Sequence, residues 1–263
     1  MLRGIVGRLR VVPSIVRALA RKKIIWFGIG STAIVFGGAF KYNEMKNYLK
    51  ENNMVILQDA DVYSFVNRFD SLDKTRDVII KINHIGGSFE HHMWVAKHIL
   101  ANKGPGKLIA HVPHYALSAG CMIMLTCDEI IVTKSTAISP SDPMLVQNPW
   151  LISGRTVLDY YEEKKNLTYE SIATSSYYKL TKSYFEECKE LVKELGVSHK
   201  WTAETQKKIY EEIFSGKHPH NRIFPLKELL NMGIVIKIDN LNRLSIPWFL
   251  RGEFIWSKLF LYS

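Results

Sequence analysis

The sequence has few cysteines, no glycine motif for a nucleotide and no internal repeat. Its three cysteines, Cys121, Cys127 and Cys188, lack the paired spacing of a disulfide framework or a Cys-rich metal site. Two of them lie in an apolar segment, where we interpret them as small buried thiols. Because no Gly-x-Gly-x-x-Gly turn is present, the sequence predicts no dinucleotide cofactor.

Acidic residues are missing from the first 23 positions, which hold seven lysines and arginines. The net charge is +10, so the remaining 240 residues carry only +3. Because the excess of positive charge lies mostly in residues 1–23, the sequence does not predict a nucleic-acid partner. A hydrophobic content of 47% over 263 residues predicts a globular protein with a substantial core.

The basic head, residues 1–23, is followed by 17 uncharged residues at 24–40. As a helix this segment would be about 25 Å long, close to the ~30 Å of a hydrocarbon core. Lys23 and Lys41 flank it, and lysines at such ends reach the lipid headgroups. We predict a single transmembrane helix with a cytosolic N-terminus. The head also has the composition of a mitochondrial presequence, so the mitochondrial inner membrane is the alternative location.

The stretch Lys107–Pro143 carries the most information. Leu108–Val112 is typical of a strand, a turn with Pro113 and Ser118 follows, and Cys121–Cys127 predicts a buried helix. An acidic turn then leads to a second β-branched run, Ile130–Thr133. The pattern is strand, turn, helix, strand, with the serine where the turn becomes the helix.

A serine at that position has two interpretations. The simpler one is helix capping, because serine is a favoured N-cap residue. The other is a nucleophile: small neighbours, Ala119 and Gly120, let other backbone approach, and the first N–H groups of a helix are unpaired. An exposed hydroxyl beside free backbone donors meets two needs of acyl-transfer chemistry.

A second strand-to-helix turn lies upstream of the serine. Val78–Ile82 predicts a strand that ends at the pair Gly86-Gly87 and enters a helix over Phe89–Leu100. Two such turns could place backbone donors next to one hydroxyl, and we assign Gly87 and Ala119 as the oxyanion donors, with Gly86 as a further candidate. Alternation of short strands with helices along the chain predicts an α/β fold.

These residues together resemble a known family. Ile82-Asn83 with Gly86-Gly87, then Val112–Gly120, Asp128–Ile130 and Ser139–Pro143, are similar to the motifs of the serine dehydrogenase proteinases. That family is grouped with the Clp-type proteolytic subunit, signal peptide peptidase A and crotonase. The resemblance covers roughly residues 50–240. We do not carry over the dehydrogenase activity in the family's name, because no cofactor turn is present.

The resemblance implies a Clp/crotonase-like domain, a repeated β-β-α spiral, over residues 54–240. It implies a serine endopeptidase that forms an acyl-enzyme on Ser118, acts on peptides or proteins, needs no cofactor and assembles as a homo-oligomer. Residues 41–53 would then connect the membrane helix to the domain. The aromatic and basic tail, 241–263, would pack on the core or a subunit, or would touch the membrane interface.

The resemblance implies that a histidine or a lysine accepts the proton of Ser118, but it does not assign one residue to that role. The Clp-type subunit would carry its histidine near Ile138–Pro143, where this sequence has Ser139, Ser141 and Asp142 instead. Membrane-bound relatives use a lysine at the start of the long helix that follows. Counting back from Gly196, the predicted end of that helix, indicates Lys179. The fallbacks are Lys164 and Lys165, and a lysine on an amphipathic helix is otherwise a solvent-facing residue.

Histidines supply the remaining candidates. The family has a histidine near the position of His220, so His220 is a possible site residue. His218 and His220 form a His-x-His pair, and His91, His92 and His98 share one predicted helix. A metal is conceivable at either group, but no Asp or Cys flanks the histidines of the predicted helix, and we predict no metal site.

Two other functions remain open from the sequence. The domain could be a non-catalytic scaffold that kept the fold. It could also be a crotonase-like acyl-CoA enzyme, in which the glycine pair matters and the serine does not.

Overall fold

A computed structural model describes residues 44–58, 62–147, 150–163 and 172–239 of the chain. The chain divides into two compact units, residues 1–49 with 246–263, and residues 50–245. The predicted basic head, the membrane helix at 24–40, the tail at 241–263, and Lys164 and Lys165 lie outside the described residues. Within the described ranges, no helix is both long and apolar enough to cross a bilayer.

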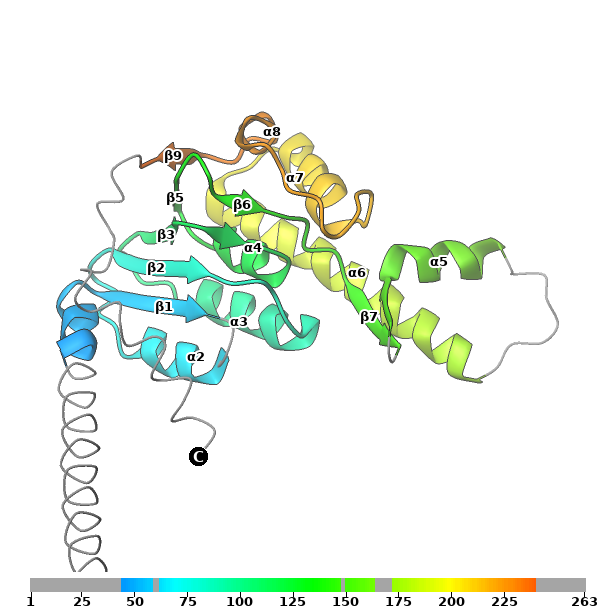
Figure 1. Ribbon diagram of the computed structural model, residues 1–263, viewed down its shortest axis with the longest axis horizontal. Coiled ribbons are helices and arrows are strands. Elements are labelled where there is room, and N and C mark those ends of the chain that lie inside the picture. The colour runs from blue at the N-terminus through cyan, green and yellow to red at the C-terminus, as the bar shows by residue number, and fades with distance from the viewer. Residues whose placement is uncertain (1–43, 59–61, 148–149, 164–171, 240–263) are drawn as a thin grey trace, which may run out of the picture. The chain divides into compact units, whose positions relative to one another are not determined.

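The larger unit is built on a parallel five-stranded sheet with the strand order β1-β2-β3-β5-β9 (Figure 1). Adjacent strands are in register at Leu57 with Ile82, Ile80 with Ala110, and Ala110 with Ile130. Because the strands are parallel, their carboxyl ends meet at one edge. The strands are β1 Met54–Gln58, β2 Val78–Asn83, β3 Leu108–Val112, β5 Glu129–Val132 and β9 Ile236–Ile238.

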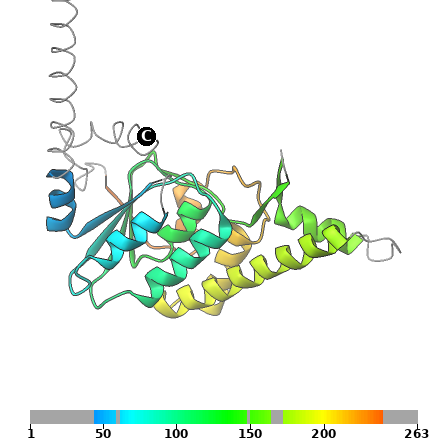
Figure 2. The same ribbon diagram turned by 90° about the horizontal axis from the view of Figure 1, so that it is seen from below.

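Two amphipathic helices cover one face of this sheet. Figure 2 shows α2, Val62–Asp70, beside α3, Phe89–Ala101. Strand β2 turns Ile80 and Ile82 to the core, both fully buried, and the residues between them are partly exposed. That alternation is the two-residue period of a strand with one covered face. The predicted α/β class is therefore confirmed.

A second, smaller sheet carries the serine turn. It pairs β4, Tyr115–Ala116, with β6, Ala137–Ile138, in parallel. Strand β4 leads directly into α4, Ala119–Met124, whose six residues are all buried. The sequence predicted this helix over Cys121–Cys127, so its start and its end were both placed too late.

The helix ends early because side chains turn the chain after it. The Thr126 hydroxyl donates to the Ile123 carbonyl at 2.7 Å. Asp128 pairs with Lys103 and accepts the Leu108 N–H at 2.8 Å. The predicted acidic turn therefore places the start of β5 next to the start of β3, because Asp128 binds the first residue of β3.

A hairpin and a helix follow the serine segment, in a region where the sequence indicated no regular strands. Strands β7, Met144–Gln147, and β8, Trp150–Ser153, are antiparallel and lead into α5, Gly154–Glu163. In Figure 1, α5 lies along the first part of α6, Ile172–His199. The rings of Tyr161 and Tyr178 stack there, with centroids 4.0 Å apart.

The predicted end of the long helix at Gly196 was wrong. Helix α6 continues through Gly196 to His199, and the left-handed residue after it is Lys200, with φ of 55°. A β-carbon on Gly196 would lie 2.3 Å from Cδ of Gln206. Gly196 therefore lets α7, Ala203–Ile209, pack closely, and the count that selected Lys179 began from an incorrect end.

The last elements return the chain to the sheet. A π-helix, Tyr210–Phe214, continues α7. A loop over residues 215–225 then leads to α8, Leu226–Asn231, and to β9. Thr202 is the N-cap of α7, and its side chain accepts a hydrogen bond from the Thr205 N–H.

Candidate active site

Ser118 has an unusual backbone conformation. Its φ is 50° and its ψ is −123°, and positive φ is uncommon for any residue but glycine. It occupies the N-cap position of α4, yet its side chain makes no capping hydrogen bond and is partly exposed. Its N–H donates to Oγ of the buried Ser139 at 2.8 Å. The hydroxyl is therefore not engaged in the capping role that was the simpler interpretation.

Gly86 lies directly against this serine. A β-carbon built on Gly86 would come within 2.6 Å of the Ser118 Cβ, 3.0 Å of its Oγ and 3.4 Å of the Ala119 nitrogen. The φ of Gly86 is 113°, a conformation that other residues rarely adopt. Glycine is therefore required here both for its backbone conformation and for space.

Two backbone donors are free at this contact. Within the described ranges, neither the Gly87 N–H nor the Ala119 N–H donates to a hydrogen bond. The N–H of Gly86 does not join them, because it donates to Nδ1 of His84 at 3.0 Å. Of the two glycines, Gly86 supplies the close approach and Gly87 supplies the free amide.

A carboxylate and a histidine that the sequence named separately meet in the structure. Nδ1 of His220 and Oδ1 of Asp142 are 2.7 Å apart, although 78 positions separate them. The Asp142 side chain is 1% exposed and that of His220 is 28% exposed. Among the described residues, Oδ2 of Asp142 has no hydrogen-bond partner. A buried carboxylate that orients a more exposed imidazole is the arrangement found in Ser-His-Asp hydrolases.

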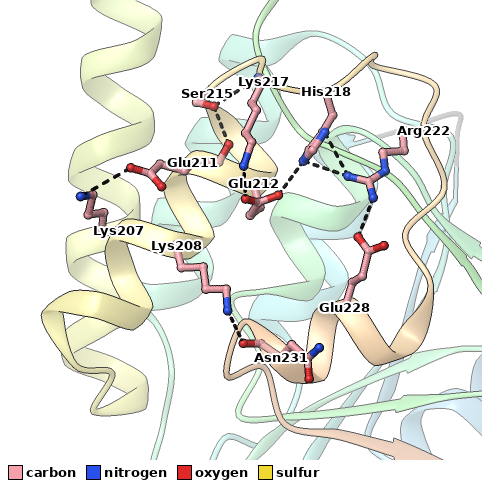
Figure 3. Close-up of polar contacts among 10 residues, drawn as sticks. All are labelled: Lys207, Lys208, Glu211, Glu212, Ser215, Lys217, His218, Arg222, Glu228 and Asn231. Carbon is pink, nitrogen blue, oxygen red and sulfur yellow. Dashed lines mark hydrogen bonds and ion pairs between the residues drawn. The ribbon is translucent and has the colours of Figure 1, made fainter.

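The loop that carries His220 is held by a charged network (Figure 3). Glu212 accepts hydrogen bonds from Lys217 and from Nε2 of His218, the latter at 2.6 Å. Arg222 contacts the His218 ring and pairs with Glu228 at 2.6 Å. His218 and His220 thus face different carboxylates, and the possible His-x-His metal pair does not form.

The helical histidines do not converge either. His98 lies 2.7 Å from Asp70, and His92 contacts His84. His91 is exposed next to the ring of Tyr63. The part of the chain that the structure describes contains no group of three or more potential metal ligands.

The predicted lysine base, Lys179, lies on α6 outside the face that packs on the core. The face of α6 that packs inward carries Thr181, Tyr184 and Phe185. Lys179 is exposed, and it lies two residues before Thr181, about 200° around the helix from it. Its side chain forms no ion pair or hydrogen bond with the described residues.

The three thiols are unreactive by burial. Cys121, Cys127 and Cys188 are free and buried, which confirms the interpretation from the sequence for Cys121 and Cys127. Burial raises the pKa of Cys121, only three residues from Ser118, to about 12. The thiolate needed for nucleophilic attack is therefore absent near neutral pH, and Ser118 is the better nucleophile of the two.

Two curated relatives, both uncharacterized proteins of Methanocaldococcus jannaschii, are similar to part of the chain. MJ1495 is 29% identical over 49% of this chain and 41% of its own length. MJ0137 is 33% identical over 36% of this chain and 32% of its own length. The chain thus spans less than half the length of the curated relatives it matches.

Solved structures of two proteases are similar to this chain at low sequence identity. The membrane-bound stomatin-specific protease 1510-N, in complex with a substrate peptide, is 20% identical. That match covers 73% of this chain and 76% of the other, with a TM-score of 0.46. The ClpP protease catalytic domain from Plasmodium falciparum is 14% identical, and the match covers 78% of this chain and 94% of the other, with a TM-score of 0.43.

The family comparison covers most of the chain. The family model described as ClpP-like SDH-type serine proteinase matches residues 53–244, which include both glycine and serine turns and the Asp142–His220 pair. By this match, and in agreement with the motifs around Gly86-Gly87 and Ser118, the chain belongs to the ClpP-like SDH-type serine proteinase family.

Proposed function

We propose that this protein is a serine endopeptidase that cleaves peptide bonds through an acyl-enzyme on Ser118. The observation that carries the proposal is the contact of Gly86 with Ser118 beside the free amides of Gly87 and Ala119. The Ser118 oxygen attacks the peptide carbonyl and its proton passes to a base. The two amides bind the oxyanion, and the leaving amine takes the proton. Water then hydrolyses the acyl-enzyme, so no cofactor enters the reaction.

The base is proposed from two sources. The family resemblance supports a lysine, and Lys179 remains its first candidate, with Lys164 and Lys165 behind it. Lys179 is exposed, and the proposal requires its Nζ to reach the Ser118 hydroxyl in the assembled protein. The second candidate is His220, since Asp142 orients its ring and the network around Glu212 holds its loop.

A covalent probe tests the proposal. A fluorophosphonate reporter should label the full-length protein, and Ser118→Ala should abolish labelling. If His220 is the base, His220→Ala should lower the labelling rate about 100-fold or more, and Lys179→Ala should leave it unchanged. The reverse pattern would identify the lysine. An unlabelled wild-type protein would overturn the peptidase proposal.

The same experiment separates the two rival functions. A non-catalytic scaffold would react with no probe. A crotonase-like acyl-CoA enzyme would use the glycine amides without the serine, so Ser118→Ala would leave thioester turnover almost unchanged. The positive φ of Ser118 favours the peptidase, because backbone strain of this kind clusters at functional positions.

We further propose that the peptidase is anchored in a membrane through residues 24–40, with its N-terminus in the cytosol. The alternative location is the mitochondrial inner membrane. The uncharged segment and its flanking lysines support the anchor. Alkaline carbonate extraction of cell membranes should leave the full-length protein in the pellet. A variant without residues 1–40 should be released, and release of the intact chain would contradict the anchor.

A homo-oligomer is proposed on a separate observation. Apolar side chains are exposed on the β7–β8 hairpin and on α5, namely Val146 at 71%, Leu151 at 68% and Tyr160 at 55%. Clustered exposed apolar residues are typical of protein interfaces. Light scattering after size-exclusion chromatography should give a mass above one chain, and Leu151→Glu should lower that mass.

A further inference from the structure

Two buried histidines lie behind the glycine turn, and the chemistry proposed above does not use them. His84 follows β2 and is 1% exposed, and His92 is on α3 and is 3% exposed. Their Nε2 atoms are 2.8 Å apart, and the ring centroids are separated by 4.8 Å at an interplanar angle of 65°. Buried imidazoles in contact require a defined arrangement of protons, because one nitrogen must donate and the other accept.

The neighbouring contacts select that arrangement. The backbone N–H of Gly86 can only donate, so Nδ1 of His84 accepts and, in the neutral ring, Nε2 of His84 carries the proton. That proton is donated to Nε2 of His92. His92 then carries its proton on Nδ1, which lies 2.8 Å from the Ser88 carbonyl oxygen and donates to it. With both rings neutral, one continuous chain of donors runs from Gly86 to Ser88.

An additional proton would break this chain, since both accepting nitrogens are already occupied. Protonated Nδ1 of His84 would face the Gly86 N–H, and protonated Nε2 of His92 would face the Nε2–H of His84. Burial, the largest cause, lowers the pKa of His92 below its ordinary value, which keeps that ring neutral near pH 7. The hydrogen-bond pattern and the burial thus both favour neutral rings for the pair.

The two histidines contact both turns of the proposed site, the glycine turn at Gly86-Gly87 and the serine turn at Ser118. The His92 ring backs the glycine turn, since a β-carbon on Gly87 would lie 2.7 Å from its Cε1. The His84 backbone reaches the serine turn: its N–H donates to the Tyr115 carbonyl, and its carbonyl accepts the Leu117 N–H at 2.9 Å. Its carbonyl oxygen would also lie 2.8 Å from a β-carbon on Gly120, which keeps α4 in close contact.

We infer that His84 and His92 are positioning residues that orient the Gly86–Gly87 peptide, so that the Gly87 N–H faces the oxyanion formed on Ser118. The inference rests on the proposed peptidase function. His84 takes the Gly86 N–H out of the site, and His92 fixes the His84 ring through the Ser88 carbonyl. Because an oxyanion donor acts only when its position is held to within a fraction of an ångström, the pair contributes to rate without touching substrate.

Three variants test the role of His92. His92→Gln keeps an acceptor oxygen near the position of Nε2 and a donor NH₂, whereas His92→Leu has neither. His91→Leu is the matched control, since His91 is the exposed neighbour on the same helix. We expect His92→Leu to lower the second-order rate of fluorophosphonate labelling about 10- to 100-fold. His92→Gln should retain the rate within about threefold, and His91→Leu should match the wild type.

Failures of the two proposals are distinguishable. Absence of wild-type labelling contradicts the peptidase function. Normal labelling of folded His92→Leu, or equal losses in His92→Leu and His92→Gln, contradicts the positioning role alone. If His92→Leu does not fold, the wild-type protein still tests the inference. Long-range ¹⁵N NMR of its histidines shows which ring nitrogen of each carries the proton. We expect the Nε2–H tautomer for His84 and Nδ1–H for His92 at pH 7, and any other pattern overturns the inference.

Discussion

Oγ of Ser139 accepts the backbone N–H of Ser118 at 2.8 Å, and Ser139 lies in the segment where a Clp-type subunit would carry its histidine. The same hydroxyl donates to the Pro140 carbonyl at 3.2 Å and is buried. A residue of that segment therefore holds the nucleophile's backbone. The contact explains how a non-glycine residue is kept at a φ of 50°.

Removing that hydroxyl should impair both stability and reactivity. Ser139→Ala leaves the Ser118 N–H without its acceptor, which should cost about 1–3 kcal/mol of unfolding free energy. We expect the fluorophosphonate labelling rate to fall about tenfold, because the backbone of Ser118 is no longer held. Urea denaturation and labelling kinetics measure the two effects. Ser141→Ala is the control, since Ser141 is equally buried two residues away, and equal loss in both variants would refute the prediction.

Replacing Gly86 should abolish labelling. Gly86→Ala places a methyl group 2.6 Å from the Ser118 Cβ at a φ of 113°, so the serine or the glycine turn has to move. Strain at such a φ costs about 1–3 kcal/mol in addition. Gly233→Ala is matched in φ, at 89°, but its nearest contact is Thr205. Both variants should lower the urea midpoint, whereas only Gly86→Ala should lose probe reactivity, and reactive Gly86→Ala would count against the site.

Glu212 should stabilise the fold at neutral pH and not in acid. Burial alone would raise the pKa of Glu212, but hydrogen bonds from Lys217 and His218 outweigh it and lower the pKa below 4.5. A carboxylate with a lowered folded-state pKa contributes stability above its unfolded pKa, and that stability is lost as the pH falls through the folded value. Glu212→Gln should therefore lose about 1–2 kcal/mol at pH 7 and much less near pH 3.

Urea midpoints at several pH values measure this difference for Glu212→Gln against the wild type. Glu211→Gln is the neighbouring control, because among the described residues the Glu211 carboxylate pairs only with the exposed Lys207, at 3.9 Å. Such surface pairs contribute little, so Glu211→Gln should resemble the wild type at every pH. A destabilisation by Glu212→Gln that does not change with pH would show that the carboxylate's charge is unimportant.

The thiols should not react in the native protein. Burial raises the pKa of Cys121 and of Cys127 to about 12, and it raises that of Cys188 as well. Titration with a disulfide reagent at pH 8 should therefore detect no thiol before unfolding and three in guanidinium chloride. Iodoacetamide should likewise leave labelling of Ser118 unchanged. Rapid modification of a thiol under native conditions, with loss of labelling, would point to cysteine chemistry instead.

Several local features could be predicted because they depend on residues close in the chain. The short β-branched runs at Val78–Ile82 and after Asp128 correctly indicated β2 and β5. The wrong helix end at Gly196 shows the limit of such patterns. Glycine ends a helix when it adopts a left-handed conformation, but it also lies inside helices where another element packs closely, as Gln206 does here.

The sequence by itself determined the α/β class, the buried thiols and the turn that carries Ser118, because hydrophobic period and turn residues act over a few positions. The tertiary structure decided which distant residues meet: Gly86 with Ser118, His84 with His92, and Asp142 with His220. It also decided that Lys179 faces solvent. These contacts depend on strand register and on the rotation of each helix about its axis, and packing of the whole domain sets both.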